Sequence, residues 1–493
     1  MCIRDRIITA SKHEQRITES PSAISIITEE DIKRSGAQSI PDILKFFPGL
    51  DVIEITSSHW EVNARGFNQL LSNKMLVLVD GRSVYFDYFG GVIWQGLPIQ
   101  LEDIKRIEIV RGPISALYGA NAFSGVINII TKSPRELIGK HFYATLGNLA
   151  TGKTSFIYGG KSGKLAYKVS AALRNCNSWR NSHLNSEKVG LGNFKIEYIF
   201  SGKSIFSIDG GLGTGNIEQI VLSDFLKFDA TTSYLKANYN YSNFSLQAFW
   251  NKGHVKAPSI VNYGKNTNIE YNTIDIETQH LFDFGSPNSI IFGGSLRYNT
   301  ISSSIIDKDH TQTLIAGYMQ NSLELTPELT ALVGIRVDKH PLVKVKWSPR
   351  MSFIFNPMRN HTFRLDASQA FRNPTFTDSY IKVPFRPQPL PSPPFPEGLS
   401  TNLTVVGNDK LNSEKIETYE LGYQTYFLDK AKFKIDFFHN KVSGFITRGD
   451  FQPVSFFKDP ITGEYIYDPF TGCLLYTSPS PRDLSTSRMP SSA

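Results

Sequence analysis

The stretch LEDIKRIEIVRGPISALYGANAFSGVINIITK (Leu101–Lys132) combines two short apolar runs with several glycines. The runs IKRIEIV and GVINIITK are typical of core strands in a small buried sheet. The glycines of RGP, LYGANA and SGV allow the chain to turn tightly between them, because glycine has no side chain to clash. Upstream, MLVLV (Met75–Val79) and the following Asp80-Gly81 turn predict another strand of the same sheet.

Two helices are predicted on the N-terminal side of this sheet. TEEDIKRSG has Thr28 as its N-cap, acidic residues in its first turn and Gly36 as its terminator. SIPDILKFFPG is capped by Ser39 and ends at Pro48-Gly49. Residues 7–133 are therefore expected to form one α/β domain.

From about residue 134 the chain alternates apolar and polar side chains, as in LAYKVSAALR, NFKIEYIF and FSLQAFWNK. About 15 such segments run as far as Arg448. A soluble β-sandwich rarely sustains so many strands, whereas a transmembrane barrel has strands of about 10 residues whose apolar side chains face lipid. The pattern therefore favours an antiparallel barrel over residues 134–472. We expect Leu165, Val169, Phe194, Tyr198, Leu246 and Trp250 to face lipid, and Lys168, Lys195 and Gln247 to face the lumen.

The two ends, MCIRDR (residues 1–6) and CLLYTSPSPRDLSTSRMPSSA (residues 473–493), fit neither pattern. Codons for the first five residues can be the reverse complement of codons for Cys473–Thr477, which is the pattern of one sequencing adapter translated at both ends. We therefore expect both segments to be adapter-derived and the chain between them to be a fragment. A natural disordered tail is the alternative.

Composition argues against several classes of function. The net charge is +7, of which the ends supply +2 through four arginines and two aspartates. In the rest of the chain, whose net charge is +5, basic residues alternate with acidic ones, unlike a nucleic-acid-binding patch. Between the ends Cys176 is the single cysteine, so no intramolecular disulfide is expected. No histidine spacing indicates a metal, and no nucleophile motif indicates an enzyme. We predict no catalytic residue, no metal site and no cofactor, and we expect GGLGTG (Gly210–Gly215) to be a loop.

Several motifs together resemble one protein family. VNARGFN (Val62–Asn68), LVLVDGRSVY (Leu76–Tyr85) and the opening stretch are similar to the plug domain of TonB-dependent outer-membrane receptors. SPRMSFIF, SQAFRNPTFTDSY and GNDKLNSEKIETYELGYQ resemble barrel strands of the same receptors. Within the family, the plug resembles the subgroup for ferric siderophores, colicins and cobalamin.

The resemblance implies a mainly β fold, with an α/β plug inside a transmembrane antiparallel barrel of 22 strands when complete, about 15 of them present. It implies active uptake of a scarce small molecule such as a ferric chelate, in the outer membrane of a Gram-negative bacterium. The implied partners are outer-membrane lipid and TonB, with ExbB and ExbD, in the inner membrane. We expect a monomer and no nucleic acid. A passive porin or an adhesin-type barrel is the alternative.

Four charged residues are expected to join the plug to the barrel. Arg65 and Arg111 each precede a glycine at a strand end, and strand parity places Glu414 and Glu420 toward the lumen. The resemblance places glutamates at these two positions opposite the plug arginines; the alternative is that they are solvated lumen residues. The resemblance also marks as plug-motif residues Gly66, Asp80, Gly81, Gly112, Pro113, Tyr118, Gly119, Gly125 and Asn128.

The sequence does not predict which residues bind the ligand. VPFRPQPLPSPPFPEG (Val383–Gly398) is proline-rich and is expected to be a stiff extracellular loop. Contact with the ligand and a passive stalk are equally open interpretations of this loop.

Overall fold

The computed structural model describes residues 6–13, 15–69, 71–178, 186–221, 224–257, 267–285, 288–358, 360–384, 388–389, 400–401, 404–427, 431–447, 455–456 and 476–477. Residues up to Phe445 belong to one compact unit, and a second unit begins at Ile446. The described strands of the second unit are β29 (Ser455–Phe456) and β30 (Tyr476–Thr477), which pair with each other. The origin of the two end segments stays a prediction.

The N-terminal domain, called the plug below, is built on a five-stranded sheet. Its strands follow the order β3 (Ala23–Thr28), β8 (Ile104–Arg111), β9 (Gly125–Thr131), β6 (Met75–Val79) and β7 (Arg82–Ser83). Strands β6 and β9 are parallel and the other neighbours are antiparallel. The remaining plug elements are β1 (Arg6–Ile7), β2 (Gln15–Arg16), η2 (Ile17–Glu19), α1 (Glu29–Ser35), α2 (Ile40–Leu44), β4 (Asp51–Glu54), β5 (Trp60–Asn63), η3 (Trp94–Gly96), η4 (Leu101–Asp103), α3 (Ser115–Tyr118) and η5 (Pro134–Glu136).

Local sequence signals explain these elements. The Thr28 side chain accepts a hydrogen bond from the backbone of Asp31 at the start of α1, and Gly36 ends that helix with a φ of 69°. The Ser39 side chain caps α2 in the same way. The apolar strands β6, β8 and β9 are buried among the plug core residues. The predicted helices and sheet are therefore confirmed, except that the second helix ends at Leu44 rather than at Pro48-Gly49.

Fifteen strands form a second, antiparallel sheet, called the wall below. The strands pair in chain order, and among the described residues β10 and β28 are its unpaired edges. The wall consists of β10 (Gly139–Gly147), β11 (Thr151–Ser162), β12 (Leu165–Asn177), β13 (Ser186–Ser201), β14 (Ser204–Val221), β15 (Asp224–Tyr241), β16 (Phe244–Ala257), β17 (Thr267–Asp283), β18 (Asn288–Ser303), β19 (His310–Thr326), β20 (Leu329–Lys339), β21 (Lys346–Met358), β22 (His361–Arg372), β27 (Glu414–Phe427) and β28 (Ala431–Ser443).

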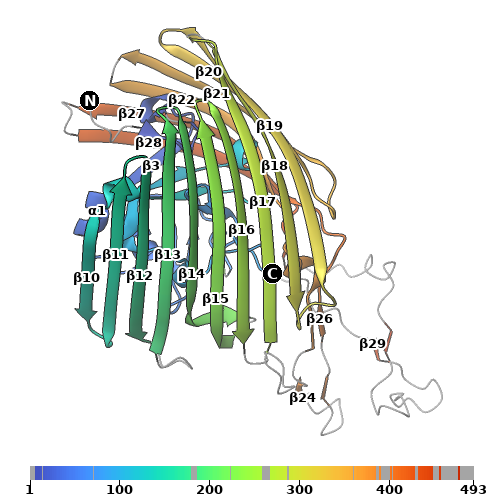
Figure 1. Cartoon of the computed structure of the whole chain (residues 1–493). Coiled ribbons are helices and arrows are strands. Elements are labelled where there is room, and N and C mark those ends of the chain that lie inside the picture. The colour runs from blue at the N-terminus through green and yellow to red at the C-terminus, as the bar shows by residue number, and fades with distance from the viewer. Residues whose placement is uncertain are drawn as a thin grey trace. The chain divides into compact units, whose positions relative to one another are not determined.

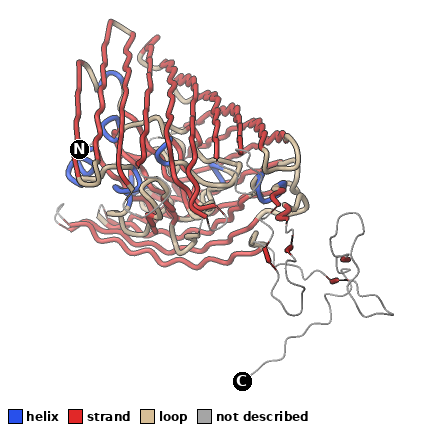
Figure 2. The backbone as a smooth tube through the Cα atoms, turned by 90° about the horizontal axis from the view of Figure 1, so that it is seen from below, coloured by secondary structure: helices blue, strands red, loops and turns tan. Residues whose placement is uncertain are grey.

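The wall curves around the plug. Its long strands run side by side in Figure 1, and Figure 2 shows the helices and loops of the plug on its concave side. The segment between β22 and β27 adds α4 (Phe376–Tyr380) and the short pairs β23 (Lys382–Pro384) with β26 (Thr404–Val406) and β24 (Gln388–Pro389) with β25 (Ser400–Thr401). Most of the proline-rich loop lies outside the described residues. Among the described helices, none is long and apolar enough to cross a membrane.

Alternation along the strands separates two faces of the wall. Val169 is 52% exposed on the outer face, whereas the adjacent Lys168 is 1% exposed on the inner face. Lys195 and Gln247 also point inward, where each binds the plug. The outward side chains are exposed at Leu165, Tyr198, Leu246 and Trp250 and half-buried at Phe194. The predicted assignment of inner and outer faces is confirmed.

The prediction of a loop at GGLGTG is wrong, because residues 210–215 lie inside β14. The glycines there let the plug approach the wall closely. A Cβ atom at Gly213 would lie 2.4 Å from the backbone oxygen of Gly96, and one at Gly211 would lie 3.0 Å from Pro98. The glycines thus make room for the plug segment after η3.

We expect Val169→Cys, in a Cys176→Ser background, to react with a thiol reagent confined to the membrane, because this side chain points away from the plug. Lys168→Cys is the matched control, one residue along the same strand, and should stay unlabelled. Labelling of membranes that contain the protein measures both. Labelling at position 168 with position 169 silent would reverse the register.

Candidate functional site

Arg65 connects the plug to the wall. It follows β5 with a φ of 61°, and its guanidinium forms an ion pair with Glu420 on β27. The ion pair is buried, and the guanidinium also lies 4.4 Å from the ring centre of Phe438. Gly112 leaves the necessary space, because a Cβ atom there would lie 2.8 Å from Arg65 Nη1. The structure therefore brings two of the expected site residues together.

Arg111 is arranged differently from the expectation. Its Nη1 donates to the backbone oxygen of Pro48 (3.0 Å), and its Nη2 lies 3.9 Å from Asp436 Oδ2 rather than beside a glutamate. Gly49 provides room for this orientation, since a Cβ atom there would lie 2.3 Å from Arg111 Nη1. The guanidinium thus lies along the plug, and its carboxylate neighbour is shared with Arg364.

Glu414 lies at the centre of a buried ion cluster. Lys74 Nζ of the plug donates to Glu414 Oε2 (2.7 Å), and Arg372 Nε of β22 donates to the same oxygen (2.6 Å). Arg372 Nη1 also donates to Asp378 Oδ2 on α4 (3.2 Å). Lys74, Arg372 and Glu414 are at most 1% exposed. A continuous chain of charges therefore links the plug sheet, two wall strands and α4.

The Asp80-Gly81 turn meets the opposite part of the wall. Lys195 Nζ lies 3.2 Å from Asp80 Oδ2, and Gln247 Nε2 donates to the backbone oxygen of Gly81 (3.3 Å). Burial raises the pKa of Asp80, but Lys195, Lys236 and hydrogen bonds from Thr131 outweigh burial and hold this pKa below its usual range. The turn is thus anchored to β13 through the Asp80 carboxylate and to β16 through the Gly81 oxygen.

The other plug-motif residues shape the backbone around these contacts. Gly119 has a φ of 74°, and a Cβ atom there would lie 2.8 Å from the guanidinium of Arg336. Gly125 lies so close to β8 that a Cβ atom would lie 2.3 Å from the Val110 oxygen. Pro113 is buried next to Gly112, and both Gly66 and Gly81 have positive φ angles. The ring of Tyr118 lies against Lys12, and the side chain of Asn128 donates a hydrogen bond to Thr9.

The long connections of the wall lie at one end, called the outer end below. Those that the structure describes include residues 304–309, 340–345, 373–384 and 404–413, whereas the opposite end has two-residue turns such as 163–164 and 242–243. The plug loop after β7 reaches the outer end, where Phe86 and Tyr88 are buried in an aromatic and aliphatic cluster. Helix α4 covers this loop, since the Thr377 backbone N–H donates to the Tyr88 oxygen (2.9 Å). Aromatic side chains of the plug loop are therefore packed against the wall and α4 at the outer end.

Two family models match this chain. The model described as TonB-dependent Receptor Plug Domain matches residues 16–126, and the model described as TonB dependent receptor-like, beta-barrel matches residues 173–468. The chain belongs to the TonB-dependent receptor family.

Individual relatives of this receptor carry different names. The vitamin B12 transporter BtuB of Vibrio vulnificus is 22% identical over 449 residues, which cover 84% of this chain and 69% of that protein. The iron-regulated outer membrane virulence protein of Vibrio cholerae is 26% identical over 397 residues, which cover 75% of this chain and 60% of that protein. The crystal structure of the siderophore receptor PirA from Acinetobacter baumannii shares the fold, with a TM-score of 0.69 and 16% identity over 92% of this chain and 74% of that chain.

The N-terminal segment of this receptor is docked on both plug and wall. The backbone N–H and the hydroxyl of Thr9 donate to Glu108 Oε2 (2.8 and 2.6 Å). Lys12 forms an ion pair with Glu277 of β17 and lies 4.5 Å from the ring centre of Tyr318. Burial lowers the pKa of Lys12, although Glu277 acts in the opposite direction. No sequence pattern indicated this docking, because the segment has no periodicity of its own.

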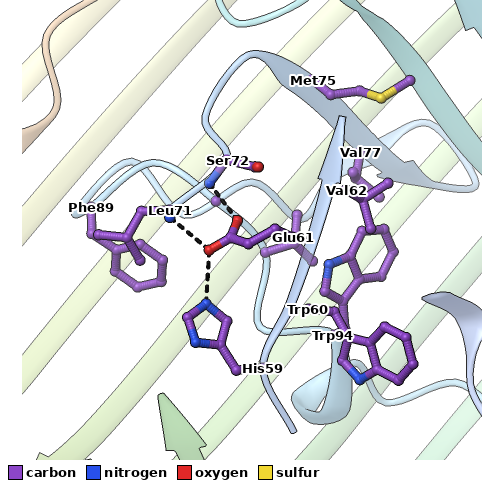
Figure 3. A pocket seen from close by; sticks show the side chains of 12 residues that line it. His59, Trp60, Glu61, Val62, Leu71, Ser72, Met75, Val77, Phe89 and Trp94 are labelled. Carbon is purple, nitrogen blue, oxygen red and sulfur yellow. Dashed lines mark hydrogen bonds and ion pairs between the residues drawn. The ribbon is translucent and has the colours of Figure 1, made fainter. Parts of the chain in front are cut away.

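A small pocket inside the plug is lined by residues that include His59, Glu61, Leu71 and Ser72 (Figure 3). His59 Nε2 lies 2.8 Å from Glu61 Oε1, and the Glu61 carboxylate accepts the backbone N–H groups of Leu71 (2.6 Å) and Ser72 (2.5 Å). The Glu61 carboxylate thus fixes the turn that positions two wall-binding cations. Within the described residues, no group of three or more His, Cys, Asp or Glu side chains is placed to hold a metal ion.

We expect Arg65→Ala to loosen the plug and admit larger antibiotics, because Glu420 would remain buried without its cation. Glu420→Ala should have a similar effect, and the double variant should be little worse than either single variant. Each single variant is expected to lower the free energy that holds the plug to the wall by at most about 3 kcal/mol. Arg34→Ala removes an exposed ion pair on α1 and is the control. Cell permeability measures the effect, and fully additive losses would show that the two residues act separately.

Glu414→Gln should destabilise the receptor strongly, because two buried cations would lose their shared carboxylate. Breaking such a buried cluster costs about 3–5 kcal/mol. Glu417→Gln is the matched control, since this residue lies on the same strand with a partly exposed side chain paired to Lys415. Thermal unfolding in detergent compares the two variants. Equal melting temperatures for both would contradict a central role of Glu414.

Proposed function

We propose that this chain forms the plug and part of the barrel of an outer-membrane receptor that takes up a scarce small molecule with energy from TonB, ExbB and ExbD. The observation that carries this proposal is the plug itself, which lies on the concave side of the wall and is bound there by separate ion pairs. Displacement of the plug requires energy, and the outer membrane has no nucleotide supply. Pulling on the plug from the inner membrane meets this requirement.

The outer end is the proposed place of ligand binding. It combines the aromatic plug loop, helix α4 and the long connections of the wall. A ligand that displaces α4 would withdraw Asp378 from Arg372 and so disturb the cluster that holds Lys74. Ligand binding at the outer end would in this way change the contact between the plug and the wall.

A ferric siderophore is the proposed ligand class, with cobalamin or another iron chelate as the neighbouring possibilities. The names of the relatives support this range, since they include a vitamin B12 transporter, an iron-regulated outer-membrane protein and a siderophore receptor. Iron would arrive inside the ligand as cargo. The exposed apolar side chains of the outer face support contact with outer-membrane lipid. We propose that the receptor works as a monomer in the outer membrane of a Gram-negative bacterium.

The alternative of a passive porin or an adhesin has less support. A porin needs an open lumen, whereas here the plug occupies the space beside the wall. An adhesin has no need for charged side chains such as Lys168 that bind the plug from inside.

We expect the full gene to restore growth of a receptor-deleted host on one class of ligand from a panel of single iron chelates and cobalamin. The same host without TonB should not grow, because the plug could not be displaced. Growth yield on each single source is the measurement. Growth that is independent of TonB and extends to unrelated small solutes would favour a porin.

A further inference from the structure

A pocket with a mixed lining of polar and apolar side chains lies between plug strand β7 and the inner face of β15, β16 and β17. Its apolar lining residues come from the plug: Val84, Phe86, Ile93, Leu97 and Pro98. Arg82 lines it from the plug, and Tyr234, Asn251, Tyr271 and Thr273 line it from the wall. Its volume is about 40 Å³. One water needs about 10–15 Å³ on this scale, so the pocket holds a few waters or one small inorganic anion.

Arg82 is a buried cation whose hydrogen-bonding capacity is only partly used. The side chain is 5% exposed, Nη1 donates to Asn251 Oδ1 (2.8 Å), and the guanidinium lies 3.7 Å from the ring centre of Tyr234. Its Nε and Nη2 are buried, and neither has a hydrogen-bond partner among the described residues. Buried donors on a charged group are costly to leave unpaired. Arg82 therefore lines the pocket and carries two buried N–H groups that have no acceptor among the described residues.

The acidic side chains nearest to Arg82 are bound to other cations. Asp80 lies 3.2 Å from Lys195 Nζ, and Asp209 lies 3.4 Å from Lys236 Nζ. Across the described part of the chain, no carboxylate lies within ion-pair distance of Arg82. Burial lowers the pKa of Arg82, and the surrounding tyrosines and aspartates do not offset this effect. The protein thus supplies a buried positive charge without a direct counter-charge.

We propose that this pocket binds a small inorganic anion, which accepts the Nε–H and Nη2–H of Arg82 and completes the contact between plug and wall. Tyr234 and Tyr271 line the same pocket from the wall. The anion would lie between β7 and β15–β17, so it would join the plug to the wall without a direct salt bridge. This inference rests on the fold and is independent of which ligand the receptor transports.

Bromide is the probe, because it is a small inorganic anion that can be located by anomalous scattering. Crystals of the purified receptor grown in sodium bromide should show an anomalous peak within hydrogen-bond distance of Arg82 Nε and Nη2. The peak should be absent in Arg82→Gln, which keeps a similar size without the charge. Electron density that fits water beside Arg82, with no anomalous signal, in crystals of the unaltered receptor would overturn the proposal.

Thermal unfolding gives a second test. The melting temperature in detergent should rise by about 2 °C when bromide replaces gluconate, an anion too large for the pocket, at the same ionic strength. The rise should persist in the control Arg34→Gln and in Arg82→Lys, and should vanish in Arg82→Gln. An equal rise in Arg82→Gln, or no rise in the unaltered receptor, would contradict a specific site.

Discussion

A charge that faces the inside of the wall needs a counter-charge or several hydrogen bonds, because the plug excludes most of the water there. The cluster of Lys74, Glu414 and Arg372 shows this constraint most clearly, since all three side chains are buried and the carboxylate accepts from both cations. The same requirement explains the pairs Arg65–Glu420, Lys168–Asp103 and Lys12–Glu277. The position of the plug is therefore set by where its charged groups find partners on the wall.

Ion pairs of this kind suit a contact that must be specific and also breakable. Desolvation offsets much of their attraction, so a correctly paired interface contributes little net stability, whereas a displaced plug leaves charges unpaired. Contacts between residues 96–98 and the glycines of β14 bring the backbones close, and Phe86 and Tyr88 add a buried hydrophobic contact with the wall at the outer end. The plug is thus positioned by polar contacts together with this hydrophobic contact, and it has a separate apolar core of its own.

Strand parity and family motifs predicted much of this arrangement. Alternation alone placed Lys168, Lys195 and Gln247 on the inner face, because a period of two fixes the face of every residue in a strand. Parity predicts the face on which a residue lies but not its partner on that face. It therefore did not predict that Glu414 binds Lys74 and Arg372 rather than a second plug arginine. Lys74 stands directly before an apolar strand and has no pattern that signals contact with the wall. The glycines of β14 were interpreted as a loop because close approach of another segment leaves no trace in local periodicity.

The contact between plug and wall is expected to be released during uptake. The most direct test of this central claim is to measure ligand uptake by a receptor whose plug is cross-linked to its wall. Arg65→Cys and Glu420→Cys in a Cys176→Ser background place two thiols at one contact, and a short cleavable bifunctional reagent can join them. The tied receptor should bind its ligand but not transport it, and cleavage of the reagent in the same sample should restore uptake. Transport at an unchanged rate while the two positions remain joined would contradict release of this contact during uptake.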